Sequence, residues 1–257
     1  MNILQSFILG IVEGLTEFLP ISSTFHLIAS ARILNLISSD FLKLFEVVIQ
    51  SGAIATLLFL YTKTLLTDKK LLLNVFYSFI PTAIIGFLLH NIIKTIFFDS
   101  NWLMFFVFVG MGLIFLLIEK NPPVLTKNCT ELTRNHAIII GLSQAFSIIP
   151  GVSRAGAVIV AMMLLGYKRD EAAKYTFLLS LPTIFAASAL DLFQGRELLM
   201  TISDGWLLLG IGFVTALVVA YFVVKWLTTY LSTHTLEIFG WYRFVLAGLL
   251  ILFKVLP

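Results

Sequence analysis

Residues 3–34 read ILQSFILGIVEGLTEFLPISSTFHLIASARIL, an apolar segment interrupted near its middle by two glutamates, a proline and three hydroxyl residues. A second apolar segment, residues 136–165, reads HAIIIGLSQAFSIIPGVSRAGAVIVAMMLL and is interrupted around its own proline. Each half of either segment holds about 10–14 apolar residues, too few for a helix to cross a bilayer. We therefore expect two helix–loop–helix hairpins that enter the membrane and return, because a broken backbone is tolerated at membrane depth only where it lines a cavity or is buried in protein.

The rest of the chain has the composition of a membrane protein. Of its 257 residues, 59% are hydrophobic and 12% are charged, whereas soluble domains carry about a quarter charged residues. Further apolar runs predict spanning helices at roughly 43–60, 71–91, 102–118, 175–191, 206–224 and 241–256. The sequence thus predicts an all-α integral membrane protein, a single membrane domain (1–257) with six transmembrane helices plus two re-entrant hairpins.

The basic residues orient this arrangement. Most of the 17 Lys and Arg residues fall on one side if the loop 61–70 is placed inside. The first hairpin then enters from the outer side and the second from the inner side. Two halves, about 1–120 and about 135–257, would be related by an inverted-topology repeat. A weak internal similarity, Gly10–Thr16 with Gly141–Ser147, agrees with such a repeat.

Several kinds of site are disfavoured by composition. A lone cysteine, Cys129, cannot form an internal disulfide, and the four histidines are far apart, without metal-ligand spacing. The net charge of +3 fits lysine-rich inner loops and gives no sign of nucleic-acid binding. Residues 3–34 also lack the charged start and cleavage site of a removable signal peptide.

Two carboxylates lie in the first hairpin. Glu13 and Glu17 are four residues apart and share one helix face, where like charges repel. Carboxylates are costly at membrane depth, so the pair needs a metal ion, a cation such as Arg154 or a shared proton. The alternative is that both glutamates lie at a wet interface and are solvated there.

Hydroxyl residues follow the carboxylates. Any of Ser22, Ser23 and Thr24 could cap the returning helix, and a helix N-terminus inside a cavity is also an anion site. On such a helix Ser23 and His26 would lie on one face, as a nucleophile and its base could. A Ser-x-x-His spacing is also common among simple caps, so it is weak support by itself.

The second hairpin carries an arginine at its break. Arg154 is costly at membrane depth unless it meets an anion, and its planar fork suits phosphate oxygens. Gly151 and Gly156 permit close approach of the backbone, and Ser153 can cap the helix that follows. If both polar breaks meet near mid-membrane, the pocket suits a polyanion with a divalent cation, such as a lipid-linked diphosphate.

These residues resemble a known family. The run from Glu13 to Thr24 followed by His26, and the run from Pro150 to Arg154, are similar to the two signatures of the undecaprenyl-diphosphatase (bacitracin-resistance protein) family. The resemblance covers essentially the whole chain. It implies hydrolysis of undecaprenyl diphosphate to undecaprenyl phosphate and inorganic phosphate, which recycles the lipid carrier for cell-wall synthesis and gives bacitracin resistance.

The resemblance also implies a setting and roles for individual residues. The protein would be a multi-pass protein of the bacterial cytoplasmic (inner) membrane, with its active site open to the outer, periplasmic face. Its partners would be the lipid substrate and membrane lipids, and a homodimer stays open. The cofactor would be a divalent cation, Mg²⁺ or Ca²⁺, bound by Glu13 and Glu17. Catalytic roles would fall on Glu13, Glu17, Ser23, His26 and Arg154, and substrate contacts on Ser22, Thr24, Gln50, Gly151, Ser153 and Arg154.

The chain departs from the family pattern at three positions. Phe25 stands where the family usually has Gly, Ala155 where it has Ser and Val158 where it has Thr. Phe25 is expected to add bulk near the site. The attack on phosphorus, by Ser23 or by metal-activated water, stays open, and in the first case either His26 or a glutamate would take the proton of Ser23. The alternative functions are a polyprenyl-phosphate transporter, since inverted repeats with broken helices are typical of transporters, and a type-2 phosphatidate-phosphatase-like enzyme, whose other motifs are missing.

Overall fold

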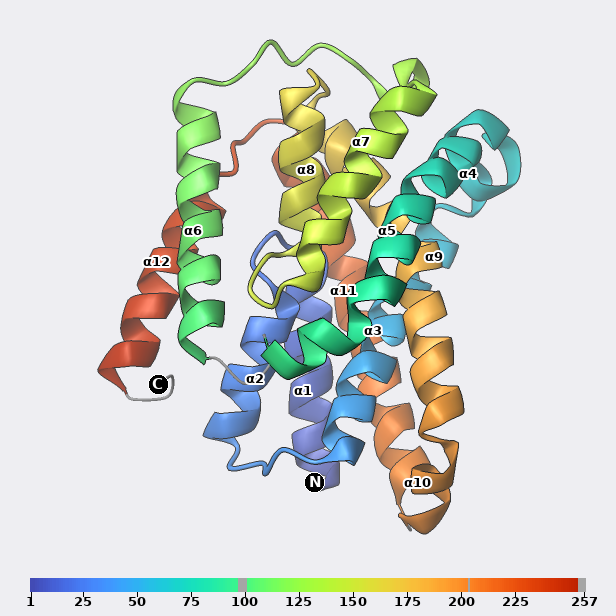
Figure 1. Cartoon of the computed structure of the whole chain (residues 1–257), viewed down its shortest axis with the longest axis vertical. Coiled ribbons are helices and arrows are strands. Elements are labelled where there is room, and N and C mark those ends of the chain that lie inside the picture. Colours follow the sequence, from blue (N-terminus) through green and yellow to red (C-terminus); the bar gives the residue numbers. More distant parts are fainter. Residues whose placement is uncertain (97–100, 203, 254–257) are drawn as a thin grey trace.

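A computed structural model describes residues 1–96, 101–202 and 204–253. In these ranges the regular structure is helical (Figure 1), apart from one isolated bridge between Lys127 and Tyr167. In chain order the helices are α1 (Ile3–Thr16), α2 (Ser23–Ile33), α3 (Asp40–Leu60), α4 (Thr62–Thr67), α5 (Lys69–Ile96), α6 (Asn101–Lys120), η1 (Cys129–Glu131), α7 (Arg134–Ala145), η2 (Phe146–Ile148), α8 (Arg154–Leu164), α9 (Arg169–Gln194), α10 (Arg196–Thr201), α11 (Gly205–Leu231) and α12 (Glu237–Leu252).

Long apolar helices form most of the bundle. In the described residues five of them, α3, α5, α6, α9 and α11, are long and apolar enough to cross a membrane. Large apolar side chains such as Phe87 and Phe222 are exposed on their outer faces, as lipid contact requires. The protein is therefore an all-α, multi-pass membrane protein, as the sequence predicts. The predicted sixth span, roughly 241–256, overlaps α12, which runs from Glu237 to Leu252 and at 16 residues is shorter than those five helices. Residues 254–256 of that predicted span lie outside the described part of the chain.

The two interrupted segments form the predicted hairpins. α1 begins and α2 ends toward the end of the molecule that carries the N-terminus, whereas α7 begins and α8 ends toward the opposite end (Figure 1). Their loops, 17–22 and 149–153, meet near the middle of the bundle, where an ion pair joins Glu17 to Arg154. Hairpins entering from opposite ends are what an inverted arrangement predicts.

Each hairpin packs on a long helix of the other part of the chain. A Cβ added to Gly10 of α1 would lie 2.7 Å from the carbonyl oxygen of Gly212 in α11. A Cβ added to Gly141 of α7 would meet the carbonyl oxygen of Ser78 in α5. Glycine thus permits both helix crossings. This reciprocal packing is consistent with two inverted halves, whose bounds stay a prediction.

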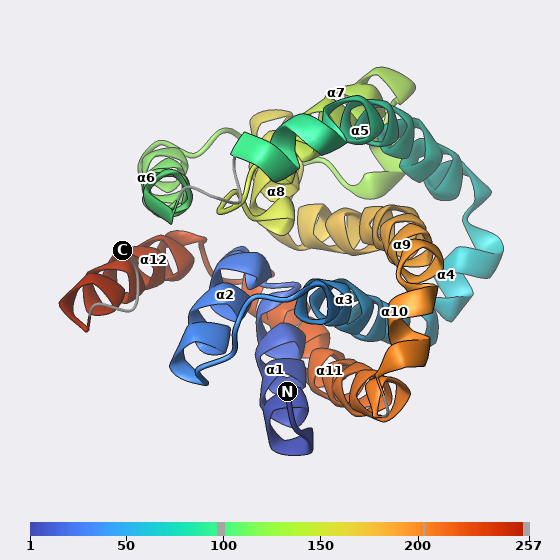
Figure 2. The same ribbon diagram turned by 60° about the horizontal axis from the view of Figure 1, so that its bottom comes forward.

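A partly buried ion pair joins α6 to α9 at the end of the molecule opposite the N-terminus. Arg169, at the start of α9, binds the carboxylate of Glu119 near the end of α6 through two N–H groups. The same carboxylate accepts a hydrogen bond of 2.9 Å from the backbone N–H of Leu236, just before α12. This contact fixes α6 and α12, which form a pair at one side of the bundle (Figure 2), to the rest of the protein.

Candidate active site

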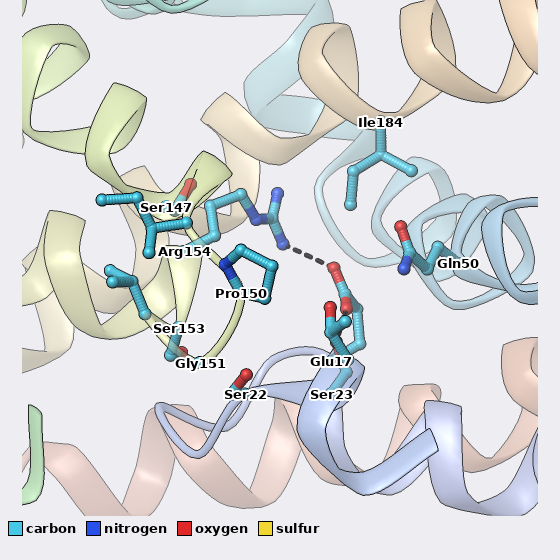
Figure 3. Close-up of a pocket in the computed structure, with 13 residues that line it drawn as sticks. Glu17, Ser22, Ser23, Gln50, Ser147, Pro150, Gly151, Ser153, Arg154 and Ile184 are labelled. Atoms are coloured by element: carbon cyan, nitrogen blue, oxygen red, sulfur yellow. Dashed lines mark hydrogen bonds and ion pairs between the residues drawn. The ribbon is translucent and has the colours of Figure 1, made fainter. Parts of the chain in front are cut away.

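A cavity lies where the two hairpin loops meet, beside α3 and α9 (Figure 3). Its apolar lining comes from the second loop and from Ile184 of α9. Its polar lining consists of Glu17, Ser22, Ser23, Thr24, Gln50, Ser147, Ser153 and Arg154. Most of the site residues predicted from the sequence therefore border one cavity, and they come from both hairpins and from α3.

An ion pair crosses this cavity from one hairpin to the other. Nη2 of Arg154 lies 2.9 Å from Oε1 of Glu17, and the two side chains are 13% and 6% exposed. The predicted meeting of these residues is thus confirmed. The Nη1 atom of Arg154 is buried and has no hydrogen-bond partner in the described structure. One branch of the guanidinium fork is therefore held by the protein, and the other is left for a ligand with oxygen acceptors.

Glu17 also binds the hydroxyl group of Ser23. Ser23 Oγ donates a hydrogen bond of 2.5 Å to Oε2 of Glu17. A carboxylate at this distance can accept the hydroxyl proton, so the contact pairs a potential nucleophile with a base. The base beside Ser23 is thus a glutamate of the same hairpin.

His26 occupies a different place from the one expected. Its Nδ1 lies 2.8 Å from the carbonyl oxygen of Ser22, and its Nε2 lies 2.8 Å from the hydroxyl oxygen of Tyr242 in α12. A carbonyl oxygen only accepts, so Nδ1 carries the proton and the Tyr242 hydroxyl donates to Nε2. The predicted pair of Ser23 and His26 is not formed, because both ring nitrogens already have these partners. His26 instead connects α2 to α12.

Glu13 is not among the residues that line the cavity. It is fully buried, and neither of its carboxylate oxygens has a hydrogen-bond partner among the described residues. The ion pair of Arg154 is with Glu17, so a metal ion or a shared proton remains for Glu13. In the described ranges no group of three or more His, Cys, Asp or Glu residues could hold a metal ion. The two carboxylates therefore fit a divalent cation only if phosphate oxygens and water complete its shell, which is how Mg²⁺ is commonly bound.

The start of α2 leaves polar groups facing the cavity. Ser22 precedes the helix with φ 69° and ψ 92°, a conformation that is uncommon for a residue other than glycine, and its side chain makes no cap. The predicted hydroxyl cap is therefore absent here, and the hydroxyls of Ser22, Ser23 and Thr24 border the cavity. Uncapped N–H groups in a first helical turn favour an anion.

The second loop has the geometry expected of its residues. Ser153 caps α8, its Oγ accepting a hydrogen bond of 3.1 Å from the N–H of Gly156. Gly151 has φ +98°, and a Cβ there would lie 2.7 Å from the carbonyl oxygen of Met104. A Cβ added to Gly156 would in turn meet the Phe115 ring at 2.7 Å. Both glycines thus permit the close approach predicted for them.

The three departures from the family pattern lie outside the cavity lining. Phe25 is fully buried within α2 and stacks on Phe108 of α6, with ring centroids 3.8 Å apart and planes 6° apart. The expectation that Phe25 adds bulk near the site is therefore wrong, because its ring packs between α2 and α6. Ala155 and Val158 are also buried, on α8.

Sequence reasoning missed the role of Arg243. This residue of α12 is fully buried, and its guanidinium donates to carbonyl oxygens of both hairpin loops. A basic residue within a predicted span was the signal that could have found it. The partners, 223 and 92 positions away, could not be read from spacing.

Comparisons with known proteins agree with this geometry. A family model described as "Bacitracin resistance protein BacA" matches residues 6–249. The chain is 42% identical over 254 residues to an undecaprenyl-diphosphatase of Campylobacter hominis, covering 96% of this chain and 97% of that protein. It is 43% identical over 250 residues to one of Aquifex aeolicus (95% of each chain) and 38% identical over 262 residues to one of Acinetobacter baumannii (98% and 95%). The chain therefore belongs to the bacitracin resistance protein BacA family.

Proposed function

We propose that this protein hydrolyses undecaprenyl diphosphate to undecaprenyl phosphate and inorganic phosphate. This reaction regenerates the lipid carrier of cell-wall synthesis and accounts for bacitracin resistance. The proposal is supported by the undecaprenyl-diphosphatase names of relatives that match nearly the full chain. It places the protein in the bacterial inner membrane, with the cavity open to the periplasmic face.

One observation carries the proposal: Arg154 and Glu17, from opposite hairpins, face one cavity with an N–O distance of 2.9 Å. Before substrate arrives, each compensates the charge of the other in a water-poor site. An incoming diphosphate competes with Glu17 for the guanidinium. Arg154 then binds phosphate oxygens, and Glu17 is freed to act on the hydroxyl of Ser23.

The residues around the cavity have different roles in binding the diphosphate and in the reaction. Arg154 and the N–H groups at the start of α2 hold the diphosphate, with Ser22, Thr24, Gln50, Gly151 and Ser153 as further contacts. In the covalent route Ser23 Oγ attacks the terminal phosphorus and Glu17 takes its proton. The bond from that phosphorus to the bridging oxygen breaks, and undecaprenyl phosphate leaves. Water then releases phosphate from Ser23. In the direct route, water replaces Ser23 as the attacking group.

Glu13 and Glu17 would hold the divalent cation, Mg²⁺ or Ca²⁺. When bound, the cation would neutralise charge on the diphosphate oxygens. The unpartnered carboxylate of Glu13 supports this assignment. The choice between a monomer and a homodimer does not enter the mechanism, because both hairpins of the cavity belong to one chain.

Phosphate release in detergent tests the proposal against the transporter alternative. Purified protein in detergent has no two-sided membrane across which to move a lipid. We expect it to release phosphate from undecaprenyl diphosphate, and Arg154→Ala to lower that release by about 10²-fold or more. Binding of the lipid without release would favour transport and contradict the proposal.

A further inference from the structure

Arg243 connects the two hairpin loops through a single guanidinium group. Its Nε and Nη2 lie 3.1 and 3.0 Å from the carbonyl oxygen of Pro20, in the first loop. Its Nη1 lies 3.2 Å from the carbonyl oxygen of Gly151, in the second loop, and 3.0 Å from that of Phe108 in α6. Pro20 precedes Ser22 and Ser23, and Gly151 precedes Ser153 and Arg154. The guanidinium therefore joins the two backbone segments that carry the site.

The acceptors around Arg243 are neutral. Within the described part of the chain no Asp or Glu carboxylate lies within ion-pair distance of it, although its side chain is fully buried. A buried charge is costly unless it is hydrogen-bonded. Here the guanidinium N–H groups donate to carbonyl oxygens of three segments. The planar fork of arginine can reach several directions at once, whereas a lysine ammonium on its flexible stem cannot reproduce that geometry.

Aromatic rings hold this guanidinium in place. Its central carbon lies 4.6 Å from the ring centroid of Phe108 and 5.4 Å from that of Phe115. Such cation–aromatic contacts are stronger when buried. Phe25, at the position where the family usually has Gly, stacks on the Phe108 ring that contacts the guanidinium. In this chain α2 therefore contributes a ring that supports the arginine.

We propose that Arg243 is a positioning residue, which sets the separation of the two loops and so aligns Ser23 with the phosphate held by Arg154. This inference rests on the proposed function for its kinetic part alone. Its geometric part, that the two hairpins move apart without Arg243, is independent of any reaction. A 1 Å misplacement of reacting groups can cost about 10²-fold in rate.

The test combines a distance measurement with kinetics. Spin labels are attached at Ile33→Cys and Leu164→Cys, exposed positions at the far ends of α2 and α8, in a Cys129→Ser background. The distance between the two labels, measured by double electron–electron resonance, reports the separation of the hairpins. The variants are Arg243→Met and the milder Arg243→Lys. The matched control is Arg169→Met, which removes a partly buried arginine that binds Glu119 of α6 and makes no hydrogen bond to either loop.

We expect a displaced or broadened distance distribution in both Arg243 variants and the wild-type distribution in Arg169→Met. We expect kcat to fall about 10²-fold in both Arg243 variants, with a smaller change in KM because Arg154 still binds phosphate. Wild-type kcat in Arg243→Lys would show that charge suffices and would overturn the proposal. An unchanged distance distribution in folded Arg243→Lys would overturn it too. If wild-type protein released no phosphate, the proposed function would fail, and the distances would still decide the geometric part.

Discussion

Replacement of Arg154 perturbs the cavity at the point where the two hairpins meet. In the resting protein its Nη2 binds Glu17 at 2.9 Å and its Nη1 has no partner. When the diphosphate is bound, both branches of the fork can donate to phosphate oxygens. A hydrogen bond to a charged group contributes about 1.5–3 kcal/mol, so the loss of two such bonds amounts to about 3–6 kcal/mol.

This energy converts directly to a rate. Each 1.36 kcal/mol of lost transition-state stabilisation is tenfold, so Arg154→Ala should lower kcat/KM by roughly 10²–10⁴-fold. Arg154→Lys retains the positive charge beside Glu17 but loses the fork. Because this variant loses one of the two hydrogen bonds, its kcat/KM should lie between those of the wild type and Arg154→Ala, about 10–10²-fold below wild type. The assay is phosphate release from undecaprenyl diphosphate by purified protein in detergent, over a range of substrate concentrations.

Two controls separate catalysis from folding. Removing one partner of a buried ion pair can destabilise a protein by about 3–5 kcal/mol, so thermal midpoints are measured for each variant. Arg196→Ala removes an exposed arginine outside the cavity and should keep the wild-type rate. Rates within threefold of wild type in folded Arg154→Ala would refute the reasoning.

Further outcomes follow from other contacts. Chelation of divalent cations with EDTA should suppress phosphate release, and added Mg²⁺ or Ca²⁺ should restore it; unaffected turnover would remove the metal role of the glutamates. Ser23→Ala should abolish a phosphoenzyme trapped in the wild type, whereas full turnover by Ser23→Ala would leave only the direct attack by water. Burial, and then the nearby Glu171 carboxylate, raise the pKa of the Cys129 thiol, so little thiolate forms near pH 8. Maleimide should therefore label Cys129 only after unfolding or at higher pH. Rapid labelling of the native protein at pH 8 would contradict this. Gly141→Ala should lower the thermal midpoint, since its Cβ would meet the Ser78 carbonyl oxygen and overpacking costs about 1–3 kcal/mol. Gly110→Ala is the control, because no described atom lies within 4 Å of its added Cβ, and equal midpoints for the two variants would refute the packing argument.

Local features of the hairpins could be predicted because local chemistry sets them. Short apolar halves around Pro20 and Pro150 cannot span a bilayer, so each segment must return. Two carboxylates and a guanidinium at membrane depth need one another, which predicted the contact between Glu17 and Arg154 without any distance. The cap by Ser153 depends on residues three apart and was equally accessible.

Contacts set by long-range packing could not be predicted. The choice of Ser23 between His26 and Glu17 depends on the turn at Ser22, whose positive φ is unusual for serine. His26 forms a hydrogen bond with Tyr242, which is 216 residues away in the sequence. The direction of the Phe25 ring likewise depends on α6, which offers Phe108 as a stacking partner. The spacing of residues within one helix does not show which helix from later in the chain packs against it.

We expect one diphosphate headgroup to bind between the two hairpin loops. The most direct measurement is an experimental structure of the protein with a non-hydrolysable methylene-diphosphonate analogue of undecaprenyl diphosphate. We predict its phosphonate oxygens within hydrogen-bonding distance of Arg154, its terminal phosphorus facing Ser23, and the bond between Arg154 and Glu17 broken. A headgroup held by one hairpin alone, or bound away from this cavity, would contradict the account.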